Sequence, residues 1–298
     1  MNKIIIIIIL ILICFLSCTG KVEKNRIITV TIEPQRYFAE QLSGGLFKIV
    51  TMVPAGTSPE TYDPSPVQMT DLAKSSAYFQ IGKIGFEEVW MDKIRKNNPG
   101  LPVFDNGSGI SYIISAEDHD QDHSDHSDHR HHAHAGGVDP HTWSSPKEAL
   151  KIAENMCKTF IEIDKENEKT YMENLKRLKT EILKTDSIVT ELISKVSCKS
   201  FIIYHPALTY FARDYGLNQL CMEINGKEPS PEQFRLLIET ARSGGVKTIF
   251  IQQEFDRKNA EIIAAETGCK LTIINPLSYY WSEETIKIAK ALSDETYE

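Results

Sequence analysis

Short apolar stretches alternate with amphipathic segments along most of this chain, and the alternation occurs in two separate runs. Each apolar stretch holds four to eight residues and ends at polar or glycine-containing sequence, which is typical of strands buried in a parallel sheet. The first run predicts strands over 26–32, 46–53, 77–81 and 101–104, and helices over 37–43, 66–75 and 86–96. The second predicts strands over 200–204, 219–224, 248–252 and 270–274, and helices over 207–215, 230–243, 257–267 and 283–292.

Two longer amphipathic segments separate these runs. Ser145, Pro146 and Glu148 occupy the positions of a capping box and open a helix expected over 146–163. A second helix is expected over 166–196, and its thirty or so residues would span roughly 45 Å. That length exceeds the need of one small domain. We therefore predict an α/β protein of two doubly wound, Rossmann-like lobes joined by a long, rigid helix.

The first seventeen residues differ in character from the rest. Lys3 precedes an apolar run over 4–16, which is shorter than the roughly twenty residues of a membrane-spanning helix and favours a secretory signal. Ser17 directly before Cys18 resembles a lipoprotein cleavage box, which would make Cys18 the lipid-bearing first residue of the mature chain. The alternative is an uncleaved N-terminal anchor. Either way, we expect the body to lie outside the cytoplasm, in the periplasm or at the cell surface, tethered to a membrane.

These features predict the division of the chain. The expected parts are a signal peptide over 1–17, a tether over 18–25, an N-terminal lobe over 26–164, a linker helix over 165–197 and a C-terminal lobe over 198–298. The length of 298 residues suits two domains, and a net charge of −8 argues against a nucleic-acid partner. Four cysteines remain beyond the leader without a CxxC spacing, and their disulfide pairing is left open: Cys157, Cys198, Cys221 and Cys269.

The histidines are concentrated in one acidic segment over 117–135. Seven of the nine lie there among six acidic residues and almost no apolar ones, which predicts a disordered surface loop. Such a composition also indicates auxiliary, weak metal sites, although a neutral low-complexity insert is the alternative. The seven are His119, His123, His126, His129, His131, His132 and His134.

Candidate metal ligands stand where the predicted strands end. In open α/β sheets, ligands bind outside the carboxyl ends of the strands. His205 directly follows one predicted strand, Glu60 lies in the loop after another, Glu254 and Asn275 follow two more, and His141 lies at a loop-to-helix junction. Imidazole and carboxylate together suit zinc and its neighbours. The alternatives are that the histidines are hydrogen-bonded structural residues and that Glu60 caps a helix, because 57–60 also fits a capping box.

Several motifs, in order along the chain, carry a resemblance to a known family. They are PAGTSPETYDPSP at 54–66, DPHTWSSP at 139–146, YHPA at 204–207, EPSP at 228–231 and NPL at 275–277, with the histidine-rich insert between the first two. Over about residues 27–292 they resemble the ZnuA/TroA-like solute-binding lipoproteins, which supply zinc or manganese to ABC importers. The resemblance implies two α/β lobes held by a long helix, with the metal in the cleft between them.

The carry-over of ligand residues from the family is uneven. His141 and His205 match ligand positions, whereas Glu60 stands where the family usually has histidine. Asn275 stands where it often has aspartate, and Gln252 where it often has glutamate. The resemblance thus implies a first shell of His141, His205 and Glu60, completed by water, Asn275 or Glu254. Zinc is the expected ion. Manganese or iron(II) competes because the set is rich in oxygen, and the histidine-rich insert favours zinc or nickel.

The function implied is binding and not catalysis. We expect a monomer that captures a divalent cation and delivers it to an ABC permease driven by a cytoplasmic ATPase. One alternative is a zinc hydrolase using the same three ligands, although no HExxH, GxSxG or Walker A pattern occurs. Another is a metallochaperone or adhesin without an importer.

Overall fold

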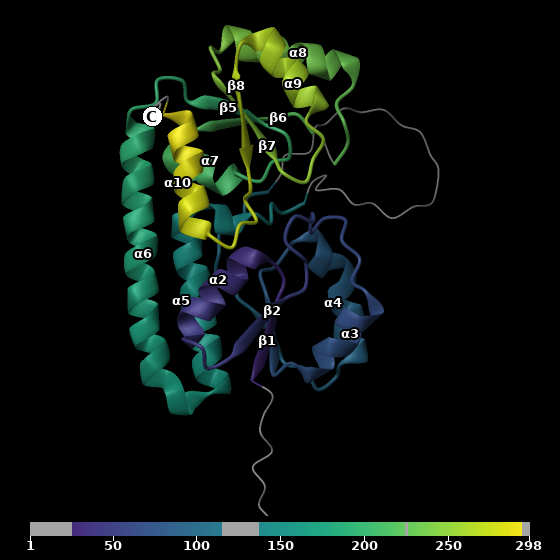
Figure 1. The fold of residues 1–298 in the computed structure, drawn as a ribbon, viewed down its shortest axis with the longest axis vertical. Helices are drawn as coiled ribbons and strands as arrows, with labels where there is room; N and C mark the ends of the chain where they lie inside the picture. The colour runs from purple at the N-terminus through teal and green to yellow at the C-terminus, as the bar shows by residue number, and fades with distance from the viewer. Residues whose placement is uncertain (1–25, 115–136, 224–225, 294–298) are drawn as a thin grey trace, which may run out of the picture.

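Two parallel, four-stranded sheets with flanking helices form the molecule, seen in a computed structural model that describes residues 26–114, 137–223 and 226–293 (Figure 1). This confirms the predicted α/β class. The predictions for the signal peptide, the tether with Cys18 and the histidine-rich segment over 117–135 lie outside the described residues. Within those residues, no helix has the length and apolar character needed to cross a membrane.

The first sheet has the strand order β2-β1-β3-β4, and all its pairings are parallel. Its elements are β1 (Ile27–Val30), α2 (Glu33–Ser43), β2 (Lys48–Thr51), α3 (Pro66–Asp71), β3 (Ala77–Gln80), α4 (Gly85–Asn97) and β4 (Val103–Asp105). The strand order turns back between β1 and β3, which creates a crevice at their carboxyl ends. We call this part the N-terminal lobe.

The second sheet repeats the same arrangement, with the order β6-β5-β7-β8 and parallel pairing throughout. Its elements are β5 (Ser200–Ile203), α7 (Thr209–Tyr215), β6 (Asn218–Cys221), α8 (Pro231–Ser243), β7 (Thr248–Gln252), α9 (Lys258–Thr267), β8 (Lys270–Ile274) and α10 (Trp281–Leu292). The equivalent crevice lies between β5 and β7. We call this part the C-terminal lobe.

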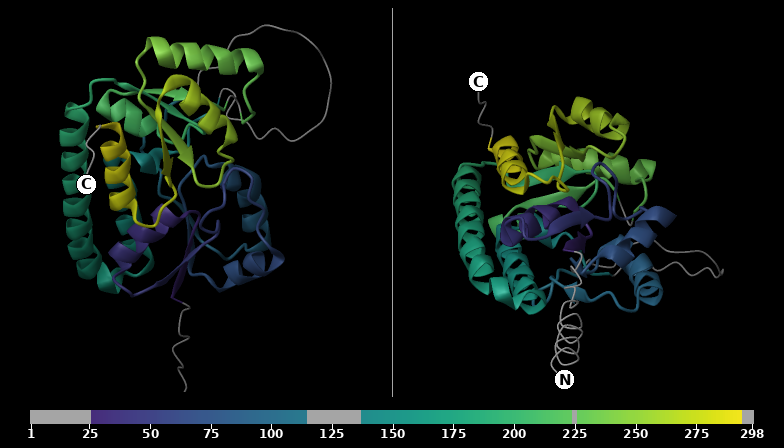
Figure 2. Two further views of the ribbon diagram at one scale, coloured as in Figure 1. Left: turned by 45° about the horizontal axis from the view of Figure 1, so that its top comes forward. Right: turned by 60° about the horizontal axis from the view of Figure 1, so that its bottom comes forward.

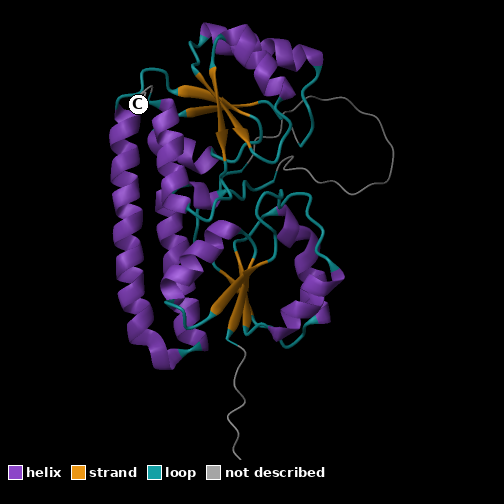
Figure 3. Ribbon diagram, viewed as in Figure 1, coloured by secondary structure: helices purple, strands orange, loops and turns teal. Residues whose placement is uncertain are grey.

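One helix runs along both lobes, as the three ribbon views show (Figures 1, 2 and 3). After α5 (Pro146–Ile163), α6 (Glu168–Ser194) extends for 27 residues, or about 40 Å at 1.5 Å per residue. Its first half buries Tyr171, Leu178 and Ile182 in the N-terminal core. Its second half buries Val189 and Leu192 in the C-terminal core, so a single amphipathic face joins the two lobes.

Aromatic side chains also hold the lobes together next to the gap between the sheets. The indole of Trp143 donates to the carbonyl of Pro276 at 2.9 Å, and the indole of Trp281 donates to the carbonyl of Trp143 at 2.7 Å. Both indoles are almost fully buried. The segments on either side of the gap are therefore fixed by contacts between lobes as well as by the long helix.

Most predicted elements are present, and the differences occur at their ends. The helix predicted over 37–43 begins four residues earlier, at Glu33. Pro34 suits its first turn, and the Gln35 side chain accepts the backbone N–H groups of Thr31 and Ile32. The helix predicted over 66–75 is α only to Asp71 and then tightens into a 3₁₀ turn.

Candidate metal centre

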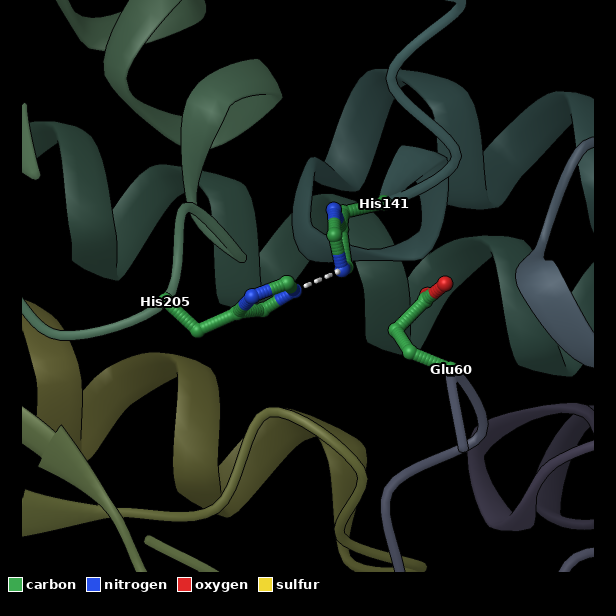
Figure 4. A group of neighbouring side chains, drawn as sticks. All are labelled: Glu60, His141 and His205. Atoms are coloured by element: carbon green, nitrogen blue, oxygen red, sulfur yellow. Dashed lines mark hydrogen bonds between the residues drawn. The ribbon is translucent and has the colours of Figure 1, made fainter. Parts of the chain in front are cut away.

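Glu60, His141 and His205 converge on one point between the two sheets (Figure 4). One ligand atom from each lies within 4.8 Å of the others, and this is the only such group of three metal-ligating side chains among the described residues. Glu60 comes from the loop after β2, and His205 follows β5. Because these two meet, the carboxyl ends of the two sheets must face each other.

The two imidazoles approach through their Nε2 atoms, which are 3.2 Å apart. Two nitrogens bound tetrahedrally to one zinc at 2.0–2.1 Å would be separated by about 3.3 Å. The rings already stand at that separation, and neither is exposed by more than 8%. This spacing suits two ligands of a single ion, and it is also the length of a hydrogen bond between the two rings.

His141 is fixed by its neighbour Asp139. One oxygen, Oδ1, accepts the backbone N–H of His141 at 2.9 Å and faces its ring Nδ1 at 3.0 Å. Burial alone would raise the pKa of Asp139, but the charge interaction with His141 and hydrogen bonds from His141 and Thr209 bring it below the ordinary value. An ionised carboxylate accepts only, so it favours the proton on Nδ1 and leaves Nε2 available as a metal ligand.

His205 is held from three sides by its own lobe. The Gln252 side chain donates to the His205 carbonyl at 2.7 Å and accepts its N–H at 3.4 Å. The ring of Phe255 stacks on the imidazole at 5.8 Å between centroids. Glu223 places Oε2 at 3.2 Å from ring Nδ1. The amide of Gln252 therefore makes both bonds to the backbone of His205. A carboxylate at this position could accept the N–H but could not donate to the carbonyl.

The alternative role of Glu60 as a helix cap is wrong. The structure describes its whole loop, and no helix begins between residues 52 and 65; the next helix is capped by Ser65. Instead, Glu60 packs against Gly85, the first residue of α4. A Cβ added at Gly85 would overlap Glu60 Oε2 and would lie 3.2 Å from Glu60 Cα. The absence of a side chain at Gly85 therefore makes room for the carboxylate.

Replacing Gly85 with alanine should displace Glu60 and weaken zinc binding about tenfold, within the range for residues that position ligands. Alanine is a good helix former, so the free energy of unfolding should change little. Chelator competition measures the affinity. Gly100→Ala is the matched control, because a Cβ there meets nothing within 4 Å. Equal affinities for the two variants would show that Gly85 does not position Glu60.

Of the other two candidate ligands, Glu254 lines the site and Asn275 does not. A cavity of about 20 Å³ lies between the ligands, which is room for one ion or one water, and Glu254 is among its lining residues. Burial raises the pKa of Glu254, while the charge of His205 acts to lower it. Asn275 is not in the lining, and its Oδ1 accepts the backbone N–H of Leu277 at 3.1 Å.

The surroundings of one cysteine, Cys221, raise the pKa of its thiol. Burial first, and then the negative charges of Asp139 and Glu223, raise the pKa of Cys221 to about 12. Cys221 is not among the residues that line the cavity, and it does not belong to the group of Glu60, His141 and His205. In the described residues Cys157, Cys198, Cys221 and Cys269 are all free thiols, so no disulfide joins them.

Comparisons with known proteins agree with this geometry. The family model described as "Zinc-uptake complex component A periplasmic" matches residues 28–290. The chain is 29% identical over 277 residues to the high-affinity zinc uptake system protein ZnuA of Bacillus subtilis, covering 91% of this chain and 84% of that protein. It is 28% identical over 276 residues to the zinc-binding protein AdcA of Streptococcus pyogenes, covering 87% of this chain. The chain spans about half the length of AdcA, 51%.

A solved structure is also similar in fold and sequence. A crystal structure of ZnuA superposes with a TM-score of 0.81 at 31% identity, covering 90% of this chain and 98% of that one. The similarity extends over both lobes and the helix between them. The arrangement of two sheets about a central gap is therefore a shared one.

Proposed function

Because this chain belongs to the family of periplasmic zinc-uptake components, we propose that it captures a divalent cation, zinc above all, outside the cytoplasmic membrane and delivers it to an ABC importer. The permease and its cytoplasmic ATPase are the proposed partners. The family consists of substrate-binding components and not of enzymes, so the hydrolase alternative is set aside. A metallochaperone or adhesin role without an importer would use the same site, and neighbouring permease and ATPase genes would argue against it.

The convergence of His141, His205 and Glu60 is the observation that carries this proposal. Two imidazoles and one carboxylate are a known ligand set for zinc with one open position. We propose that water or Glu254 fills that position. Asn275 stands where the family often has an aspartate ligand, but it would first have to give up its hydrogen bond from Leu277. The small cavity favours a bare ion as cargo over an organic substrate.

The oxygen donors leave manganese and iron(II) as competing cargo. Carboxylate and water suit these ions better than imidazole does, whereas imidazole favours zinc. Two of the three proposed ligands are imidazoles, and their Nε2 separation of 3.2 Å fits the tetrahedral angle that zinc prefers. We therefore expect zinc to displace manganese when both are offered at equal concentration.

Deleting residues 117–135 tests this function, because it separates the proposed tight site from the seven histidines of the insert. Calorimetry should show one tight zinc site in both proteins and additional weak sites only in the intact chain. Elemental analysis of the untagged protein that lacks residues 117–135 should then give one zinc per chain. Loss of the tight site on deletion would place the main site in the insert and contradict the proposal.

We also propose that Cys18 carries the lipid that tethers a monomer to the membrane, after removal of a signal peptide over 1–17. We propose that a tether over 18–25 follows, then the N-terminal lobe to residue 164, the linker helix over 165–197 and the C-terminal lobe from residue 198. The support is the apolar run followed by Ser17 and Cys18. Fatty-acid labelling of the protein, lost in Cys18→Ala, is the expected result, and an unlabelled chain would point to an uncleaved anchor.

A further inference from the structure

The pairing of two strands places Glu223 beside His205. In the parallel register of β5 and β6, Ile203 faces Cys221, and the pairing continues past the strand ends. The backbone N–H of Glu223 donates to the carbonyl of Tyr204 at 3.0 Å. Two residues beyond Ile203 and two beyond Cys221, His205 and Glu223 therefore stand opposite each other.

The side chains of this pair meet in a partly dry environment. Glu223 Oε2 lies 3.2 Å from His205 Nδ1, and the two side chains are only 11% and 10% exposed. A carboxylate can only accept a hydrogen bond, so this contact favours the proton on Nδ1. The lone pair of Nε2 is then directed away from Glu223 and towards the proposed ion position.

The N-terminal lobe contains a similar pair of a carboxylate and a histidine. Asp139 faces Nδ1 of His141 at 3.0 Å, as Glu223 faces Nδ1 of His205. The two Nε2 atoms meet at 3.2 Å between the lobes. Each lobe thus supplies one histidine together with the carboxylate that orients it.

We propose that Glu223 is a positioning residue that fixes the tautomer and direction of His205 and thereby sets the affinity of the centre. The inference rests on the function proposed above. Glu223 also contributes charge. A divalent ion held by two neutral imidazoles and Glu60 carries a net charge of +1, which is costly to bury, and Glu223 supplies one negative charge beside His205, as Asp139 does beside His141.

Zinc affinities of two substitutions separate these contributions. Glu223→Ala removes both acceptor and charge and should weaken binding by about 10–100-fold. Glu223→Gln keeps an acceptor for Nδ1–H and removes only the charge, so its loss should be smaller than that of Glu223→Ala. Glu154→Ala is the matched control, because Glu154 pairs with Lys179 at a half-exposed site on α5. Chelator competition on the full mature chain gives the affinities. Unchanged affinity in Glu223→Ala would overturn the proposal.

The tautomer of His205 is a second measurement, and it would not change if Glu223 only stabilised the fold. Long-range proton–nitrogen correlation spectra of the metal-free protein at about pH 8, with His205 assigned by its loss in His205→Ala, report which nitrogen is protonated. They are recorded in a His141→Ala background, because the Nε2 of His141 at 3.2 Å can otherwise share a proton with the Nε2 of His205. In that background we expect Nδ1–H with Glu223 intact and with Glu223→Gln, and a mixture with Glu223→Ala. An Nε2–H tautomer with Glu223 intact refutes the role even if Glu223→Ala does not fold. A wild type that binds no zinc contradicts the proposed function instead.

Discussion

Replacing His141 and His205 together with alanine is expected to weaken binding at the tight zinc site by about 10,000-fold. A structural zinc site is worth about 10–16 kcal/mol in total, so each of four ligands contributes about 3 kcal/mol and two contribute about 6 kcal/mol. Both lobes should contribute to this loss of affinity, because each histidine belongs to a different lobe. Competition against a chromophoric zinc chelator measures affinities in this range.

Three controls make that result specific. The comparison is made in the chain lacking residues 117–135, since the seven histidines of the insert would otherwise bind zinc and obscure the loss. The single substitutions should each cost about 100-fold. Thermal unfolding in the presence of a chelator checks that the metal-free variants still fold. If the double variant keeps the affinity of the parent, the site lies elsewhere and the assignment of His141 and His205 is wrong.

The sequence predicted the fold well because each signal was local and repeated. Helix α5 has the predicted bounds because Ser145 caps it, accepting the N–H groups of Lys147 and Glu148. The reciprocal half of that box is replaced by tertiary contacts, since the Glu148 side chain pairs with Arg213. The early start of α2 could not be read from periodicity, because Gln35 satisfies the backbone only once β1 is in place.

The site was predictable in part. The rule that ligands gather at the carboxyl ends of strands brought together Glu60 and His205, which are far apart in sequence. It could not give the direction of Asn275, whose side chain is used inside its own turn. Glu223 was missed because its position depends on the register of two strands. Aligning the predicted strands over 200–204 and 219–224 at their first residues would place His205 opposite residue 224, one position from Glu223, because the observed pairing begins at Asn218 and not at Gln219.

Glu87, in the first turn of α4, is a buried carboxylate at the carboxyl ends of β1 and β3 in the N-terminal sheet. It is 3% exposed, and its oxygens accept the N–H groups of Ile81 at 2.9 Å and Gly82 at 2.8 Å. The hydroxyl of Thr31 also bonds to it. These partners come from the ends of β1 and β3. Burial nevertheless raises the pKa of Glu87 to about 7.

The raised pKa predicts that Glu87 makes the protein less stable as pH rises. The folded state binds the proton more tightly than the unfolded state, whose ordinary value is near 4.5. The resulting stability is complete below about pH 4.5 and is lost as the pH passes through 7. The difference between the two pKa values corresponds to about 3 kcal/mol. Replacing Glu87 with glutamine should remove this pH dependence.

The measurement is the free energy of unfolding in urea, taken with a chelator present between pH 5 and pH 9. Titration of other groups, the histidines included, is common to both proteins and cancels in the difference between Glu87→Gln and wild type. That difference should move by about 3 kcal/mol in favour of the variant as the pH rises. Glu88→Gln is the matched control, since Glu88 occupies the same first turn of α4 but is exposed, and its difference should stay flat. Parallel curves for Glu87→Gln and wild type would mean that Glu87 is ionised throughout this range, because its three hydrogen bonds then outweigh the cost of burial.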